Sequence, residues 1–409
     1  MKRFSCSSLT TMAVCLLFIP ALLKAQPRPA HRKKVGVVLS GGGAKGMAHI
    51  GVLKVIEKAG IPIDYVVGTS MGSIIGGLYS IGYSPEQLDS MVRRQDWTFL
   101  LSDKIPRSEQ NLSERDASQK YVFSIPFGKG VKAEVFGGLI RGQNLANLFS
   151  ELTIGYHDSI NFNKLPISFA CVSENIVNGN EINFHEGVLA TAMRASMAIP
   201  GVFTPVRLDS MVLVDGGVVN NYPVNVARAM GADLIIGVDV QSELKPAGEL
   251  NSAGAILGQL VNLMGQDLYK KNLKETTTYI KVNVEGYSAA SFTPSAIDTL
   301  IMRGEEAAMA QDSALMALKS QLGLDSTYMP QPIPSYPYSP ERKVYVKEIT
   351  FDGLDEKDKK WLLKRCDLKE NSEISIRRIE EATAILSANL GYSGAVSYTH
   401  LTLPTTERV

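Results

Sequence analysis

The chain alternates short apolar runs with stretches of helical periodicity, and this alternation most constrains its fold. Residues 35–39 form an apolar run typical of a buried strand, and residues 48–59 follow with the spacing of an amphipathic helix. Residues 63–67 and 71–81 repeat the pair, so two strands and two helices occupy about 45 residues. Because parallel strands need a crossover connection, usually a helix, the pattern predicts an α/β fold with a mostly parallel central sheet.

The same alternation continues further along the chain. It predicts two more strands and two more helices, at residues 167–172 and 234–240 and at residues 189–198 and 224–230. Since one type of pattern covers the whole stretch, we assign residues 34–325 to a single α/β domain.

A proline-rich stretch at residues 326–341 ends this domain. Its five prolines alternate with tyrosine, serine and other residues, which is typical of a stiff, extended linker. Residues 342–397 follow with a predicted strand, two helices and the start of another strand, and we expect a small α+β domain there. Residues 398–409 continue no pattern and stay unassigned.

The first 25 residues have the pattern of a secretory signal peptide. A basic start precedes an apolar run at residues 12–19, and Ala25 provides a small residue for cleavage. Residues 26–33 form a basic leader after it. The pattern predicts export of the protein, and the alternative is an uncleaved membrane anchor.

Composition excludes several classes of protein. Hydrophobic residues make up 45% and charged residues 20%, which excludes a wholly disordered or collagen-like chain. The 42 basic and 41 acidic residues nearly cancel, so no charge excess indicates nucleic-acid binding. Cys6 and Cys15 would leave with the signal peptide, and we expect Cys171 and Cys366 to be packing residues. No clustered ligand spacing predicts a metal, and we expect no cofactor.

A glycine cluster at residues 41–46 follows the first predicted strand and opens a helix. It satisfies G-x-G-x-x-G, and Asp64 lies at about the spacing of a ribose-binding acid, so a dinucleotide-dependent oxidoreductase is one interpretation. Backbone N–H groups in such a loop stabilise negative charge, whether of a pyrophosphate or of a reaction oxyanion. A plain tight turn is the third interpretation.

The second glycine motif favours a hydrolase. Gly68, Ser70 and Gly72 form G-x-S-x-G between a predicted strand and a helix, the context of a nucleophile elbow. We expect the glycines to keep the approach to Ser70 open and the N–H of Met71 to stabilise an oxyanion. Asp64 lies near the start of its strand, where a dinucleotide fold would need it at the end. A serine in an ordinary turn is the alternative.

Asp215 is the candidate base for this serine. None of the five histidines lies at the end of a late predicted strand, and His185 is only a minor candidate for a triad. Asp215, in contrast, ends a predicted strand and is followed by Gly216 and Gly217. We expect burial, or a direct bond to Ser70, to make this carboxylate a useful base. An Asp-Gly turn is the alternative.

These three motifs, in this order, resemble the patatin-like phospholipase family. Further stretches are similar to the family as well, at residues 49–53, 195–203 and 221–224. The resemblance implies a three-layer α/β fold and hydrolysis of phospholipid acyl esters, without a cofactor, by a dyad of Ser70 and Asp215. It also implies an oxyanion hole formed by the glycine loop and Met71, with glycine and lysine positions that support the motifs: Gly41, Gly42 and Gly43; Lys45, Gly46, Gly68, Gly72, Gly216 and Gly217.

The resemblance implies a phospholipid or other lipid ester as substrate, a membrane surface as partner and no nucleic acid; a homo-oligomer is left open. Residues 97–105 are either an interfacial lid or core packing. Residues 342–397 resemble a single POTRA-type module, and the domain order resembles outer-membrane patatin proteins. We therefore expect a periplasmic, outer-membrane or cell-surface location and a longer natural chain. A non-catalytic envelope assembly module is the alternative function.

Overall fold

The computed structural model describes three parts of the chain: residues 32–103; residues 138–333 except 157, 245, 252–255, 257 and 260–262; and residues 341–382 except 342, 350–355 and 380. The predicted signal peptide, almost all of the leader and the tail at residues 398–409 lie outside these residues, as do residues 334–340 of the linker. These assignments stay predictions. Within the described residues, no helix is long and apolar enough to cross a membrane.

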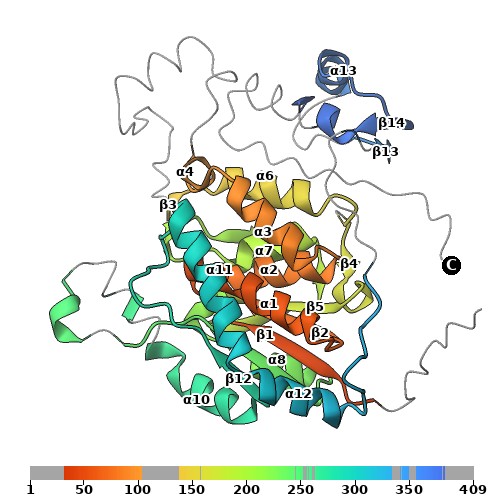
Figure 1. The fold of residues 1–409 in the computed structure, drawn as a ribbon. Helices are drawn as coiled ribbons and strands as arrows, with labels where there is room; N and C mark the ends of the chain where they lie inside the picture. The colour runs from red at the N-terminus through yellow and green to blue at the C-terminus, as the bar shows by residue number, and fades with distance from the viewer. Residues whose placement is uncertain are drawn as a thin grey trace, which may run out of the picture. The chain divides into compact units, whose positions relative to one another are not determined.

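An eight-stranded sheet forms the centre of the α/β domain (Figure 1). Its strands are β1 (Val35–Leu39), β2 (Tyr65–Thr69), β5 (Ser168–Asn175), β6 (Asn180–Phe184), β9 (Val206–Leu208), β10 (Met211–Asp215), β11 (Leu234–Asp239) and β12 (Thr278–Lys281). The strands β12-β11-β1-β2-β5 run parallel in that order. Strands β6 and β10 pair antiparallel with β5, and β9 pairs antiparallel with β10. The predicted α/β fold with a mostly parallel sheet is confirmed.

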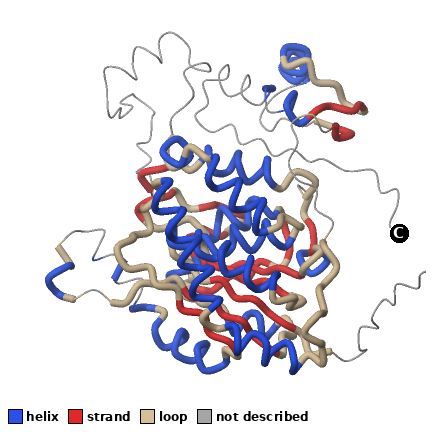
Figure 2. The backbone as a smooth tube through the Cα atoms, in the orientation of Figure 1, coloured by secondary structure: helices blue, strands red, loops and turns tan. Residues whose placement is uncertain are grey.

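The strand side chains alternate between two apolar layers, because successive residues of a strand point to opposite faces. In β1, Val37 and Leu39 belong to the larger core, whereas Val38 belongs to the smaller core on the other face. The larger core includes α1 (Ala48–Lys58), α2 (Met71–Ser80), α3 (Pro85–Arg94), α6 (Gln143–Leu152), α7 (Leu189–Ser196), α11 (Pro294–Met309) and α12 (Asp312–Gln321). The smaller core includes α8 (Val224–Ala229) and α10 (Gln266–Glu275). Figure 2 shows helices on both sides of the strands, which gives three layers.

Shorter elements complete the domain. Strand β3 (Gly138–Ile140) pairs with β8 (Gly201–Phe203), and β4 (Ile160–Asn161) pairs with β7 (Glu186–Gly187). Helix α4 (Trp97–Leu100) follows α3, and four 3-10 turns lie at Gly43–Met47, Phe162–Lys164, Gly216–Val218 and Ala247–Glu249. Two of these turns directly follow the ends of β1 and β10, where the glycine motifs lie.

Strand β2 begins two residues later than the sequence pattern predicts. Asp64 lies before it in a loop, where its carboxylate accepts a hydrogen bond from the N–H of Val35 at 2.8 Å. The backbone N–H of Asp64 in turn donates to the carbonyl of Val35 at 2.9 Å. The strand therefore ends at Thr69, directly before Ser70.

The C-terminal described segment contains β13 (Lys343–Val346), α13 (Glu356–Arg365) and β14 (Ser372–Ser375). The two strands pair antiparallel, and Val344 lies opposite Ile374. The sequence pattern places no strand between its two helices, because β14 is four residues long and has one apolar side chain. The prediction of strand, helix, helix, strand was wrong in this order, and the POTRA-like assignment stays a prediction.

Candidate active site

Ser70 lies in a sharp turn between β2 and α2. Its backbone adopts φ 54° and ψ −122°, a region that residues with a side chain rarely occupy, and such strain concentrates at functional sites. The backbone N–H of Ser70 donates to the hydroxyl of Ser196 at 3.0 Å, and that hydroxyl donates to the carbonyl of Val172 at 2.6 Å. The turn is thus tied to β5 through one serine, whose part in the site the sequence motifs did not indicate.

Two glycines allow this turn, for a different reason from the one predicted. A Cβ at Gly68 would lie 2.3 Å from the carbonyl carbon and oxygen of Gly72, and a Cβ at Gly72 would lie 2.2 Å from the carbonyl oxygen of Leu39. Both contacts are with backbone, which cannot move aside. The glycines are therefore required by the close packing of helix on strand, whereas we had expected them to clear the approach to Ser70.

The structure brings Ser70 and Asp215 together across 145 positions of sequence. The hydroxyl of Ser70 donates to Oδ2 of Asp215 at 2.7 Å, and the two residues are only 5% and 6% exposed. Asp215 ends β10, and its other oxygen, Oδ1, accepts a hydrogen bond from the N–H of Gly217 at 2.7 Å. The carboxylate is therefore held by one bond from the turn that follows it and by one bond from the serine.

Burial changes the proton affinity of this carboxylate. Loss of hydration raises the pKa of Asp215 from 3.8 to about 6, and the hydrogen bonds from Ser70 and from the N–H of Gly217 oppose this rise. A base is most effective when its pKa lies near the working pH. Asp215 is therefore ionised at neutral pH and still basic enough to accept a proton from a hydroxyl.

The glycine loop at the end of β1 lies beside Ser70. Gly43 and Met71 line the same cavity as Ser70, which fits the predicted place of their N–H groups. The N–H of Gly41, however, donates to the carbonyl of Asn221 at 3.2 Å. We therefore correct the predicted oxyanion hole by leaving Gly41 out of it, and Gly42, Gly43 and Met71 stay as predicted donors.

An apolar cavity of about 260 Å³ extends from Ser70. Side chains from three helices and a distant loop form its wall, among them Ile74 and Leu78 of α2, Met91 of α3, Leu145 and Phe149 of α6, and Phe292. Since an apolar cavity of 150 Å³ binds benzene, this volume has room for about ten carbon atoms. The cavity therefore suits one extended hydrocarbon chain with its end at the serine.

Comparison with known proteins agrees with this site. Residues 37–228 match the family model described as patatin-like phospholipase. The α/β domain belongs to the patatin-like phospholipase family. The match contains β1, the glycine loop, the serine turn and the Asp215 turn, and it ends within α8.

Curated relatives match the same region of the chain. A lysophospholipase NTE1 of Candida albicans is 31% identical over 221 residues, which are 53% of this chain and 14% of that protein. A patatin-like phospholipase domain-containing protein of Caenorhabditis elegans is 35% identical over 211 residues, 51% of this chain and 14% of that protein. An uncharacterized NTE family protein of Mycobacterium bovis is 28% identical over 230 residues, 56% of this chain and 55% of that protein. The chain thus spans a small part of the first two relatives and about half of the third.

The other predicted positions of the patatin-like domain have packing contacts. The ammonium group of buried Lys45 donates to the hydroxyl of Ser242 at 2.8 Å. A Cβ at Gly46 would lie 2.4 Å from Cγ of Met71, and a Cβ at Gly216 would lie 2.3 Å from the carbonyl oxygen of Val172. These residues therefore let the loops of the site pack closely.

The two described histidines form no hydrogen bond with Ser70 or Asp215. The Nε2 atom of buried His49 lies 2.8 Å from the carbonyl oxygen of Ser40, and burial lowers its pKa to about 4. The backbone carbonyl of His185 accepts a bond from Phe162. Among the residues that the structure describes, Asp215 alone is placed to accept the proton of Ser70. In the same residues, no three His, Cys, Asp or Glu side chains are grouped as metal ligands.

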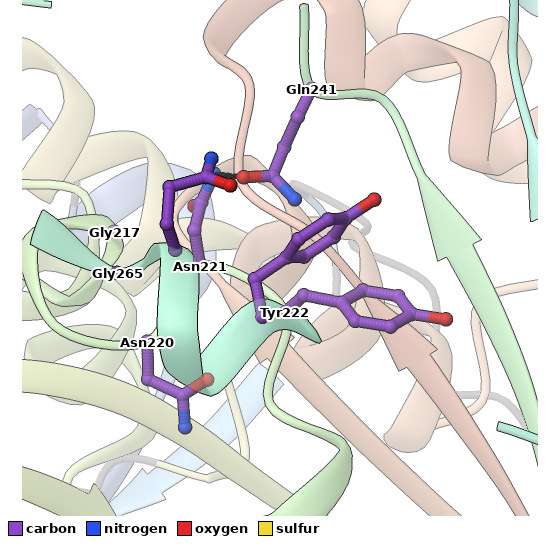
Figure 3. Close-up of a pocket in the computed structure, with 8 residues that line it drawn as sticks. Gly217, Asn220, Asn221, Tyr222, Gln241 and Gly265 are labelled. Carbon is purple, nitrogen blue, oxygen red and sulfur yellow. Dashed lines mark hydrogen bonds between the residues drawn. The ribbon is translucent and has the colours of Figure 1, made fainter. Parts of the chain in front are cut away.

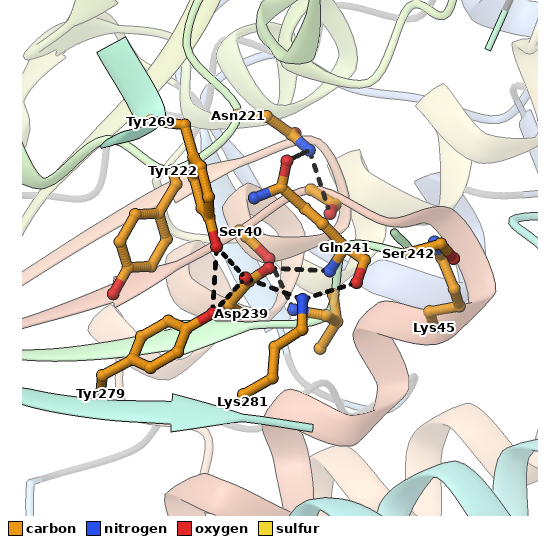
Figure 4. Close-up of polar contacts among 12 residues, drawn as sticks. Ser40, Lys45, Asn221, Tyr222, Asp239, Gln241, Ser242, Tyr269, Tyr279 and Lys281 are labelled. Carbon is orange, nitrogen blue, oxygen red and sulfur yellow. Dashed lines mark hydrogen bonds and ion pairs between the residues drawn. The ribbon is translucent and has the colours of Figure 1, made fainter. Parts of the chain in front are cut away.

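A buried carboxylate that the motifs did not indicate lies at the end of the neighbouring strand β11. Asp239 accepts bonds from the hydroxyls of Tyr269 and Tyr279, at 2.8 and 2.7 Å, and from the ammonium group of Lys281 at 2.9 Å (Figure 4). Burial acts to raise the pKa of Asp239, but the charge of Lys281 and these bonds outweigh it and hold the pKa below its ordinary value. Asp239 also accepts a bond from the backbone N–H of Gln241 at 2.8 Å, so this cluster fixes the start of the loop beyond β11.

The predicted lid at residues 97–105 is described only as far as residue 103. Trp97 and Leu101 line the apolar cavity, and Leu100 is buried. The ring of Trp97 stacks on Phe292 with centroids 4.8 Å apart. The described part of this stretch therefore belongs to the cavity wall and the core.

Proposed function

We propose that this protein is a lipid acyl hydrolase of the phospholipase A type that uses Ser70 as nucleophile and Asp215 as base. The observation that carries the proposal is the 2.7 Å bond between the Ser70 hydroxyl and a buried carboxylate, at the end of an apolar cavity with room for one acyl chain. The name of the Candida albicans relative, a lysophospholipase, supports the same substrate class.

In the first half of the reaction, the oxygen of Ser70 attacks the ester carbonyl carbon, and its proton passes to Asp215. The N–H groups of Gly42, Gly43 and Met71 stabilise the oxyanion, and loss of one such donor typically costs about 100- to 1000-fold in rate. The carbon–oxygen bond of the ester then breaks. Asp215 returns the proton to the leaving alcohol, and the acyl group stays on Ser70.

In the second half, water attacks the acyl carbon and gives a proton to Asp215. The bond between the acyl carbon and Ser70 breaks, the serine oxygen takes that proton back, and a fatty acid leaves. The apolar cavity holds the acyl chain throughout, so chain binding and carbonyl position are coupled.

Residue positions argue against the dinucleotide alternative. The carboxylate of Asp64 is bonded to the N–H of Val35 and to the ammonium group of Lys34, at the amino end of β1. The glycine loop follows Leu39 at the carboxyl end of the same strand. Five residues of strand separate them by about 15 Å, so Asp64 is far from a ligand on that loop.

We also propose that the protein is exported and acts at a membrane surface of the cell envelope. The signal-peptide pattern of the first 25 residues supports export. The apolar substrate of the proposed reaction is found in membranes. A protein that stays inside the cell after expression with its own N-terminus would contradict this location.

Release of fatty acid from phospholipid vesicles tests the proposed activity. We expect the wild-type protein to release fatty acid and Ser70→Ala to lose at least about 1000-fold of the rate, because the nucleophile is gone. Ser320→Ala, at an exposed serine on α12, is the matched control and should keep wild-type activity. Fatty acid release by purified Ser70→Ala at the wild-type rate would reject the proposal.

A further inference from the structure

A small polar crevice lies on the other side of the Asp215 turn from the apolar cavity. It has a volume of about 10 Å³, and Gly217, Asn221, Gln241 and Tyr269 are among the residues that line it. Figure 3 shows Gln241 reaching towards Asn221 across this crevice. A volume of about one probe sphere between several polar groups is sufficient for one water molecule.

Asn221 connects this crevice to both residues of the dyad. A Cβ at Gly41 would lie 2.3 Å from Oδ1 of Asn221 and 3.1 Å from Cβ of Ser70. A Cβ at Gly217 would lie 2.8 Å from the same Oδ1 and 3.0 Å from Oδ1 of Asp215. The carboxamide oxygen of Asn221 is therefore separated from each member of the dyad by about the width of one methyl group.

Gln241 fixes the orientation of Asn221. The side-chain amide of Asn221 donates to Oε1 of Gln241 at 2.9 Å, so its oxygen is the atom directed between the two glycines. Gln241 is anchored in turn by its backbone bond to Asp239.

Gln241 also carries a hydrogen-bond donor without a partner. Its Nε2 atom is inaccessible to solvent and forms no hydrogen bond to the described residues. An unsatisfied buried donor is costly, and a bound water is the usual remedy.

We propose that Asn221 and Gln241 hold the water that hydrolyses the acyl-enzyme. This inference rests on the proposed function. The water accepts a bond from Nε2 of Gln241 and donates one to Oδ1 of Asn221. Its second proton goes to Asp215, and its remaining lone pair attacks the acyl carbon on Ser70. When the bond from that carbon to Ser70 breaks, Asp215 returns the proton to the serine oxygen and a carboxylic acid leaves.

The shapes of the two hollows require separate entry of chain and water. An acyl chain on Ser70 occupies the apolar cavity, whose wall offers a water molecule almost no hydrogen bonds. The crevice, lined by amide and hydroxyl groups, reaches the dyad from the opposite side. Asn221 and Gln241 are thus positioning residues for deacylation, and they have no part in the attack of Ser70 on the ester.

Stopped-flow kinetics with p-nitrophenyl octanoate test this inference. Release of nitrophenol in the first turnover reports acylation, and the steady-state rate reports deacylation when that step is slow. For Asn221→Leu we expect acylation within about threefold of wild type and deacylation slowed by about 10- to 100-fold, the cost of a misplaced reactant. A burst of about one nitrophenol per enzyme should then appear or grow. Asn251→Ala, at an exposed asparagine, is the matched control.

A second readout separates water positioning from general damage to the site. With methanol added, the acyl-enzyme gives either the free acid or the methyl ester, and loss of a site built for water should raise the methyl-ester share in Asn221→Leu. Gln241→Glu keeps an acceptor for Asn221 but replaces the Nε2 donor, and it should shift both readouts in the same direction. It also carries the test if Asn221→Leu does not fold, as judged by thermal unfolding.

Equal losses in acylation and deacylation, or an unchanged product ratio in both variants, would overturn the inference and leave the proposed function standing. A wild-type protein that neither releases nitrophenol nor reacts with a fluorophosphonate would contradict the proposed function itself, and the inference would fall with it.

Discussion

The two hollows beside the dyad differ in size and in chemistry. The cavity on one side has about 260 Å³ and walls of aliphatic and aromatic side chains from the helices of the larger core. The crevice on the other side has about 10 Å³ and walls of amide, hydroxyl and glycine groups from the loops that follow β10 and β11. Ser70 and Asp215 lie between them. The difference teaches that one pair of residues can serve a water-excluding half-reaction and a water-consuming one.

The largest effect should come from changing the carboxylate between the hollows. Asp215→Asn keeps the shape of the side chain but removes the base, and we expect kcat for ester hydrolysis to fall by about 100- to 10,000-fold. Steady-state hydrolysis of a p-nitrophenyl ester measures it. Asp209→Asn, in the exposed turn before β10, provides a matched control. A loss below tenfold would mean that another group accepts the proton.

A smaller effect should follow from shortening the apolar hollow. Leu78 lies two helical turns beyond Ser70 along α2, about 12 Å away, and it lines the cavity. We expect Leu78→Phe to lower kcat/KM about tenfold for esters of long acyl chains, because a bulkier side chain occupies their space, and to leave butyrate esters within about twofold. A series of p-nitrophenyl esters of increasing length measures this. An unchanged length profile would show that the chain binds elsewhere.

The smallest effect should appear in stability. Burial raises the pKa of Asp215 from 3.8 to about 6, so the folded protein binds this proton more tightly than the unfolded chain does. The resulting stability is fully present below pH 3.8 and is lost as the pH rises through 6. Asparagine has no such proton to lose. We therefore expect Asp215→Asn to exceed the wild type in free energy of unfolding by at most about 3 kcal/mol at pH 8, and by little at pH 4.

Denaturant unfolding at these two pH values measures the difference. The Asp209→Asn control should show no such change with pH. A variant less stable than wild type at pH 8 would contradict the burial argument.

The sequence was sufficient for what lies in short, local patterns. The βαβ alternation predicted the parallel sheet, and two glycine motifs and an Asp-Gly-Gly turn located the residues that the structure brings together at Ser70 and Asp215. Such patterns are readable because a sharp turn restricts residue types at adjacent positions. The bond of Gly41 to Asn221 was not readable, since it joins residues 180 positions apart.

The cavity and the Asp239 cluster could not be predicted for a related reason. Leu145, Phe149 and Phe292 have the character of any core residue, and only the tertiary fold turns their side chains towards one hollow. Asp239 ends a predicted strand much as Asp215 does, but no glycine follows it to mark an approach for a ligand. Its partners on α10 and β12 come from a different part of the chain.

The most direct test of the central claim is to locate the adduct of a long-chain fluorophosphonate by peptide mass spectrometry. The account predicts one adduct, on Ser70, formed quickly in the wild-type protein and at least about 100-fold more slowly in Asp215→Asn. An adduct on another residue, or equally rapid labelling of Ser70 without the Asp215 carboxylate, would contradict it.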